Sequence, residues 1–217
     1  MKLSWFFLML FALGSVLLSY VHMEVNNYVN IALLVSIVAL SLIAKGQENI
    51  KHVSVLLLLV TVAEYFLNVL LLSMREQGLA AHLTNTYIFG GQLVFDILVL
   101  MVLKRRVYWS LRYVRRTNPD NWRAIYMTHA DPLLYGIFFA FVLVDLAAFG
   151  ENIIRNLEHL GVDEAFAKQF WSWGLIYNNY EILKSILLSC VITTLLATIF
   201  VERQRPAEAE PEFEAKP

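Results

Sequence analysis

The sequence predicts an all-α, polytopic membrane protein with six transmembrane helices. Hydrophobic residues make up 59% of its 217 positions and charged residues only 16%, whereas a soluble domain has about 45–50% and about 25%. This composition argues against a disordered chain, a basic nucleic-acid-binding protein and an ordinary soluble enzyme. The single cysteine, Cys190, excludes an internal disulfide and a cysteine-rich metal site.

Six apolar stretches meet or approach the roughly 20 residues that a transmembrane helix needs. The second is the shortest, and the first lacks a small-x-small cleavage site after it, so we expect an uncleaved first helix. Residues 1–202 should form one transmembrane domain, while residues 203–217, rich in Pro, Ala and Glu, should be a disordered cytoplasmic tail. The expected spans are about Leu3–Val21, Val29–Ala44, Val53–Met74, Thr86–Leu103, Leu133–Phe149 and Ile182–Val201.

Basic residues indicate how the chain is oriented. With six crossings and a cytoplasmic N-terminus, 13 of the 17 lysines and arginines fall at the cytoplasmic side or in the tail. Cytoplasmic loops carry an excess of these residues, and the reverse orientation would break that rule. We therefore expect both termini in the cytoplasm. The compact six-span layout also favours a bacterial inner membrane.

The longer cytoplasmic connection, residues 104–131, is basic and aromatic. We expect the fourth span to continue past the membrane as a helix that bends along its surface, where arginines meet anionic lipid phosphates or a soluble partner. Plain positive-inside topology also explains most of these charges. The residues expected to bind lipid or a partner are Arg105, Arg106, Trp109, Arg112, Arg115 and Arg116.

Breaks and caps are expected at both long connections. Asn118-Pro119-Asp120 should end the basic helix, and Asp131-Pro132 should cap and open the fifth span. Residues 150–180 should form an outer-surface segment that contains a helix Glu151–Leu160 closed by Gly161, followed by a second helix.

Polar side chains on the third and fourth spans form a mirrored pattern. Glu64 and Asn68 are four residues apart, as are Gln92 and Asp96, so each pair shares one helical face. Because these two spans run antiparallel, the carboxyls should share one level near the midplane and the amides the next level outward. Two facing carboxyls in a low dielectric cannot both stay ionised cheaply.

Two interpretations of this pattern remain open. The four residues are either a protonatable or cation-binding site, or polar side chains that hydrogen-bond across helices and hold them together. Ionisable groups inside a span cost about 2.5–3.5 kcal/mol. Asp145 and Lys184, in the outer half of sequential spans, should form a buried ion pair; alternatively, Lys184 extends to the outer headgroups.

Two function classes compete. The first is a small transporter or channel subunit that uses Glu64, Asn68, Gln92 and Asp96 near the midplane as a proton- or cation-responsive site. The second is a membrane anchor or sensor subunit, as in toxin-immunity or phage-defence (antiviral) systems, that forms a homo-oligomer or binds a soluble partner through its basic segment. Neither class requires a cofactor, a metal or nucleic acid, and the absence of catalytic motifs indicates that the chain is not an enzyme.

Overall fold

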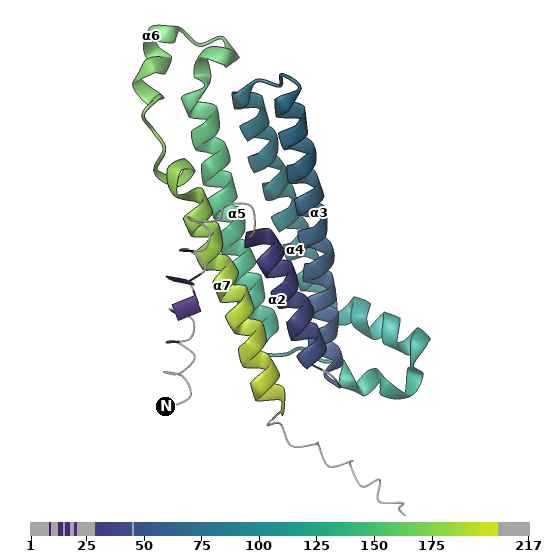
Figure 1. The fold of residues 1–217 in the computed structure, drawn as a ribbon. Helices are drawn as coiled ribbons and strands as arrows, with labels where there is room; N and C mark the ends of the chain where they lie inside the picture. The colour runs from purple at the N-terminus through teal and green to yellow at the C-terminus, as the bar shows by residue number, and fades with distance from the viewer. Residues whose placement is uncertain are drawn as a thin grey trace, which may run out of the picture.

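The computed structural model describes residues 29–44 and 46–203, together with a few isolated positions before residue 21. The described residues contain helices and no strand, which agrees with the predicted fold class (Figure 1). Most of the predicted first span and the tail beyond Arg203 lie outside the described residues. In chain order the elements are α2 (Val29–Ile43), α3 (Glu48–Glu76), α4 (Ala81–Thr117), η1 (Pro119–Ala124), α5 (Ala130–Arg155), η2 (Leu157–Leu160), α6 (Glu164–Ala167), η3 (Lys168–Phe170) and α7 (Leu175–Arg203).

Among the described residues, four helices are long and apolar enough to cross a membrane: α3, α4, α5 and α7. The chain is therefore a multi-pass helical membrane protein. Of the six predicted spans, the described residues contain four, and the predicted first span lies mostly outside them. The predicted second span is the 15-residue helix α2, which at about 1.5 Å per residue rises only about 22 Å and falls short of a hydrocarbon core about 30 Å thick.

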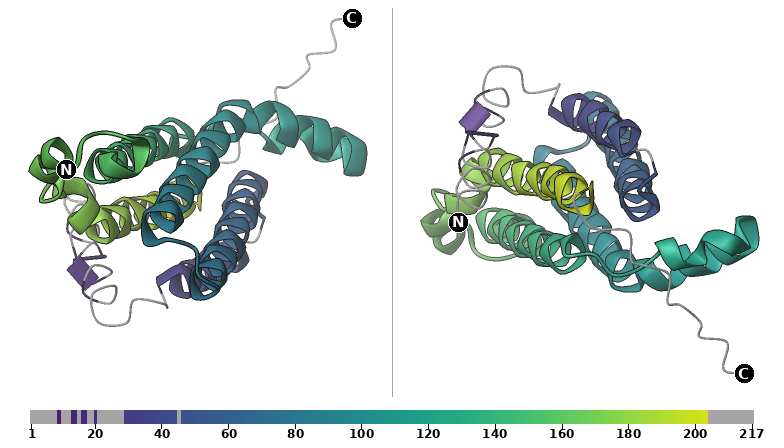
Figure 2. Two further views of the ribbon diagram at one scale, coloured as in Figure 1. Left: turned by 90° about the horizontal axis from the view of Figure 1, so that it is seen from above. Right: turned by 90° about the horizontal axis from the view of Figure 1, so that it is seen from below.

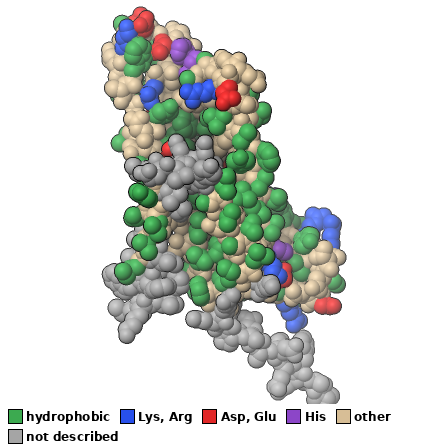
Figure 3. Space-filling model, viewed as in Figure 1, with side chains coloured by type: hydrophobic (Ala, Val, Ile, Leu, Met, Phe, Trp, Pro, Cys, Tyr) green, Lys and Arg blue, Asp and Glu red, His purple; other side chains and the backbone are tan. Residues whose placement is uncertain are grey.

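The four long helices form a bundle in which α4 packs against both α3 and α5, and α5 packs against α7 (Figure 2). The short helix α2 lies against α3 and α7 in the lower half of Figure 1. There it completes an apolar core that includes Ile37, Leu57, Val99, Leu134 and Leu195. Apolar side chains also spread over the outer face of the bundle (Figure 3), as expected where lipid replaces water.

At the lower end, α4 continues past the bundle, as the sequence predicts, and ends at Thr117 (Figure 1). The chain then turns at Asn118, whose extended φ of −148° is outside the helical range, and Pro119 opens the short helix η1. Proline at this position disfavours a helical conformation for the residue before it. The predicted basic helix is therefore the C-terminal part of α4.

The structure corrects the roles predicted for Arg106 and Asp131. Arg106 is only 3% exposed, and its guanidinium lies 2.5 Å from Asp131 Oδ2 while donating to Asn49 Oδ1 and the Tyr126 carbonyl. Asp131 does not cap α5; the N-cap is His129, and Asp131 Oδ2 accepts from the backbone N–H and hydroxyl of Thr128. This buried group fastens α4 to the start of α5 and is withdrawn from lipid.

At the upper end, the predicted helix Glu151–Leu160 is instead the end of α5 followed by the 3₁₀ turn η2. Gly161 ends that turn with a φ of +85°, a left-handed conformation that glycine adopts without steric cost. Both Glu151 carboxylate oxygens accept from the backbone N–H of Ile176, and one of them also accepts from Tyr177. A carboxylate at the N-terminus of a helix is favourable, so Glu151 fixes where α7 begins.

Candidate functional site

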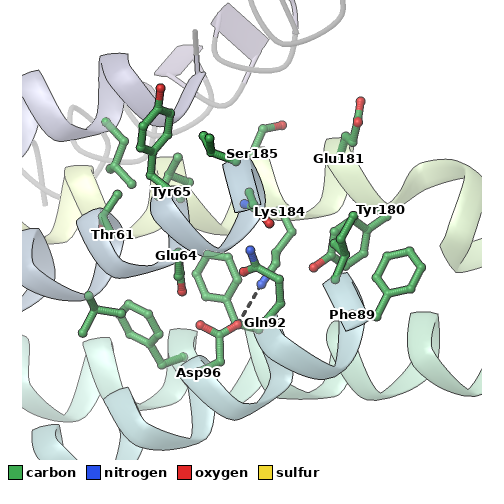
Figure 4. A pocket seen from close by; sticks show the side chains of 18 of the residues that line it. Thr61, Glu64, Tyr65, Phe89, Gln92, Asp96, Tyr180, Glu181, Lys184 and Ser185 are labelled. Carbon is green, nitrogen blue, oxygen red and sulfur yellow. Dashed lines mark hydrogen bonds and ion pairs between the residues drawn. The ribbon is translucent and has the colours of Figure 1, made fainter. Parts of the chain in front are cut away.

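A cavity of about 750 Å³ lies among α3, α4, α5 and α7, between the middle of the bundle and its upper end. All four residues predicted for an ion or proton site line it: Glu64, Asn68, Gln92 and Asp96. Figure 4 shows the carboxyls of Glu64 and Asp96 turned toward the same part of the cavity from two neighbouring helices. The sequence predicts from their helical spacing that these four side chains lie together, and in the structure they line one cavity.

Close packing of α3 and α4 holds the two polar faces beside each other. A Cβ at Gly91 would lie 2.5 Å from Leu67 Cδ2, so the absence of a side chain lets the Leu67 side chain approach the backbone of α4. Small residues commonly allow helices in membranes to approach closely. Gly91 therefore serves packing, and α4 runs through Gly90-Gly91 without a break.

Lys184 on α7 joins two carboxylates from two other helices. Its Nζ atom lies 2.7 Å from Asp96 Oδ2 and 2.8 Å from Asp145 Oδ1. The carboxylates are deeply buried, with Asp96 2% and Asp145 0% exposed. The hydroxyl of Tyr180 donates to the same Asp145 oxygen over 2.8 Å. The sequence predicts the Asp145–Lys184 contact, but it does not predict that Lys184 also binds Asp96.

This contact changes the meaning of the predicted pair of carboxyls. Glu64 and Asp96 were expected to lie at one level and face each other or a shared cavity, and Asp96 is in addition bound by Lys184 (Figure 4). Among the described residues, Lys184 makes no ion pair with Glu64. Of Glu64, Asp96 and Asp145, Glu64 is thus the carboxyl that makes no ion pair with Lys184, and a further carboxyl, Glu181, also lines the cavity.

The two amides also lack the partners that purely structural polar contacts would give them. Gln92 is 8% exposed, lines the cavity and makes no hydrogen bond to a described residue (Figure 4). The Asn68 Oδ1 atom is buried and has no hydrogen-bond partner in the described part of the chain. Buried polar groups are normally hydrogen-bonded, so these amides are free to bind a ligand in the cavity rather than tie α3 to α4.

Aromatic residues of the cavity were missed in the sequence. Lys184 Nζ lies 4.7 Å from the ring centroid of Phe141 and 5.6 Å from that of Tyr180. Phe89 packs edge-on against Tyr180 at a centroid distance of 4.9 Å. One signal existed, because Tyr180 precedes Lys184 by four residues and so shares its helical face; nothing in the sequence pointed to Phe89 or Phe141.

The other predicted binding residues lie at the opposite end of the molecule. Arg105, Arg112, Arg115, Arg116 and Trp109 are exposed on the part of α4 that extends beyond the bundle. Only Arg106 of the predicted set is buried. The exposed arginines remain a surface that can contact lipid headgroups or another molecule.

No protein family model, curated protein or solved structure matches this chain. Its function must therefore be argued from the cavity and from the exposed basic helix. Of these two features, the cavity has the more specific chemistry.

Proposed function

We propose that the protein is a small transporter or channel subunit that moves protons or other cations through the cavity. The observation that carries this proposal is the excess of carboxyls over ammonium groups: Lys184 stands with Glu64, Asp96 and Asp145 beside a space of about 750 Å³ that Glu181 also lines. In their ordinary charged states these four groups sum to −2. An excess of negative charge in a low-dielectric site attracts a proton or a cation, because an isolated buried carboxylate is costly.

Lys184 gives such a site a way to respond to binding. Its ammonium already bridges Asp96 and Asp145, so a cation that arrives at Glu64 repels it and weakens one of these contacts. The contacts connect α7 to both α4 and α5, and a change in them alters how these helices are held together. Binding at Glu64 can thereby be coupled to a movement of α7.

Reconstitution into proteoliposomes tests this proposal. With a dye inside the vesicles that responds to protons, or to sodium or potassium in parallel assays, a gradient of that cation should produce flux that depends on the protein, and Glu64→Gln should abolish it. Glu76→Gln is the matched control, because Glu76 lies on the same helix but is exposed at its end, away from the cavity. Absence of flux from the wild-type protein under proton, sodium and potassium gradients would overturn the proposal.

The orientation proposed for this transporter places the lower, basic end in the cytoplasm. The exposed arginines of α4 lie at that end, and positive charge is enriched on the cytoplasmic side. A reporter active only outside the cytoplasm should therefore be silent when fused after Val201 and active when fused near Glu158. The opposite pattern would invert the direction of transport.

A second candidate function is supported by the same basic end. The projecting part of α4 and η1 presents arginines beside tryptophan, with the Arg115 guanidinium 5.4 Å from the centre of the Trp122 ring. This surface suits a membrane anchor or sensor subunit that holds a soluble partner or anionic lipid. Copurification of a soluble protein in detergent, lost when Arg105, Arg112 and Arg116 are replaced by Gln, would favour this candidate over transport.

A further inference from the structure

The cavity is much larger than a proton or a bare metal ion requires. Its volume of about 750 Å³ lies within the range of about 300–1,000 Å³ typical of sites for small organic molecules. Its rim includes exposed apolar side chains, among them Val69 and Leu72. An entering molecule therefore meets an apolar surface first and the carboxyls deeper in the cavity.

The acidic side chains of the cavity favour a molecule with a positive charge. Asp96 and Asp145 are already bound by Lys184, so of these three central carboxyls Glu64 is the one that can hold an incoming positive charge. Among the residues that the structure describes, no cluster of three or more His, Cys, Asp or Glu side chains is placed to hold a metal ion. Carboxylates without a complete set of metal ligands suit an organic cation, whose charge needs only one counter-ion such as Glu64.

The aromatic lining suits the same class of molecule. Phe141 and Tyr180 already hold the Lys184 ammonium at cation–π distances, which shows that rings and cations coexist in this space. Tyr65 stands at the rim, 37% exposed, and Figure 4 shows it above Glu64 on the same helix. Aromatic faces attract organic cations, and the unpartnered Gln92 amide offers one polar contact beside them.

We propose that the cavity binds an amphipathic organic cation, such as a substituted ammonium or phosphonium, with its charge at Glu64 and its apolar body against the rings and aliphatic side chains. This inference rests on the proposed function, because it names the substrate class of the same site. The ammonium of Lys184 is paired with Asp96 and Asp145 and does not compete for Glu64.

Equilibrium dialysis of the purified full-length protein in detergent tests the inference, with tetraphenylphosphonium as the probe. Tetraphenylborate has nearly the same shape and the opposite charge, and empty micelles give the background. The wild-type protein should bind the phosphonium saturably and the borate no better than empty micelles do. Glu64→Gln should weaken phosphonium binding at least about tenfold, while Glu76→Gln should bind like the wild type.

Two further variants test whether a loss of phosphonium binding comes from the lost charge rather than from misfolding. Glu64→Asp retains the charge and should retain most of the binding, and Gln92→Met keeps the side-chain length but removes the amide, so it should weaken binding a few-fold. Equal binding of the phosphonium by wild type and Glu64→Gln would overturn the inference, as would equal binding of the borate and the phosphonium by wild type.

The two proposals can fail separately. If the wild type carries a Glu64-dependent proton or sodium flux but does not bind the phosphonium, the transport function stands and the organic-cation inference is wrong. If the protein binds the phosphonium through Glu64 but no gradient of protons, sodium or the phosphonium itself produces flux, the site exists and the transport function is wrong.

Discussion

Two buried charge clusters in this bundle differ in composition and surroundings. At the lower end, Arg106 meets one carboxylate, Asp131, with Asn49 and a backbone carbonyl as further acceptors. In the middle, Lys184 meets two carboxylates, and two more acidic side chains, Glu64 and Glu181, line the same cavity. The lower cluster balances its charges one to one, whereas the central cluster leaves carboxylates in excess.

The difference indicates separate tasks for the two clusters. A buried ion pair costs desolvation energy, which is offset only when the two groups are well aligned and their remaining hydrogen bonds are made. Arg106 makes such contacts with Asp131, Asn49 and a backbone carbonyl, so this cluster fits a role in holding helices together. An unbalanced cluster beside an open space is a poor way to hold helices together. The Glu64 carboxyl adds a desolvation cost, and it forms no ion pair with Lys184 that would offset this cost. Intramembrane ionisable residues of this kind usually mark an ion or substrate pathway.

The largest loss of stability is expected at the lower cluster. Arg106→Met should lower the free energy of unfolding by about 3–5 kcal/mol, because it leaves the carboxylate of Asp131 buried without its cation. Thermal unfolding of the purified protein in detergent measures this. Arg105→Met is the matched control: its side chain is exposed, so its effect should stay within about 0.5 kcal/mol. Equal effects of the two changes would contradict the buried role of Arg106.

A somewhat smaller loss is expected at Lys184, because the adjacent cavity allows water or protons to relieve the remaining carboxylates. Lys184→Met should lower the folded yield, and adding Asp145→Asn should restore part of it. Since Asp96 also binds Lys184, adding Asp96→Asn should restore more. Fluorescence-detected size-exclusion chromatography measures the yield, and a double variant that is worse than either single change would contradict the shared ion pair.

Glu64→Gln should change stability very little while abolishing flux. The amide keeps the shape of the side chain, and no ion pair with Lys184 is lost. Melting temperature and proteoliposome flux should be measured on the same preparation. A large drop in melting temperature would show that Glu64 has a structural task after all.

The smallest effect on stability is expected at the basic surface. Replacing Arg112, Arg115 and Arg116 by Gln should leave the melting temperature nearly unchanged, because these side chains are exposed. Binding to anionic lipid should weaken by about 1 kcal/mol for each charge removed near the surface. Native mass spectrometry with phosphatidylglycerol reports this loss, and unchanged lipid binding would leave positive-inside topology as the sole reason for the charges.

The sequence predicted what depends on local patterns. Long apolar stretches marked the four spans, and the run from Lys104 with the break at Asn118 marked the extension of α4. Spacing of four residues was enough to place Glu64, Asn68, Gln92 and Asp96 around one cavity. The predicted second span was wrong because hydropathy does not distinguish a 15-residue packed helix such as α2 from a full crossing.

What the sequence left open depends on how helices rotate against each other. The contact of Lys184 with Asp96 joins residues 88 positions apart, and nothing local selects Asp96 over Glu64. The burial of Arg106 was not predicted, because the residue lies in a run of basic residues. A signal existed in its helical spacing, since the buried face of this part of α4 consists of Leu103, Arg106, Ser110 and Val114.

The difference between a carboxyl that faces the cavity and one that is enclosed by its partners can be measured directly with dicyclohexylcarbodiimide. This apolar reagent modifies the carboxyls that it can reach. After treatment of the protein in membranes, peptide mass spectrometry should find modification at Glu64, in the cavity, and little or none at Asp131, which is closed off by Arg106 and Thr128. Tetraphenylphosphonium should slow the reaction at Glu64. Modification of Asp131 as fast as Glu64, or an unreactive Glu64, would contradict the assignment of a functional site to the cavity and a structural one to the lower cluster.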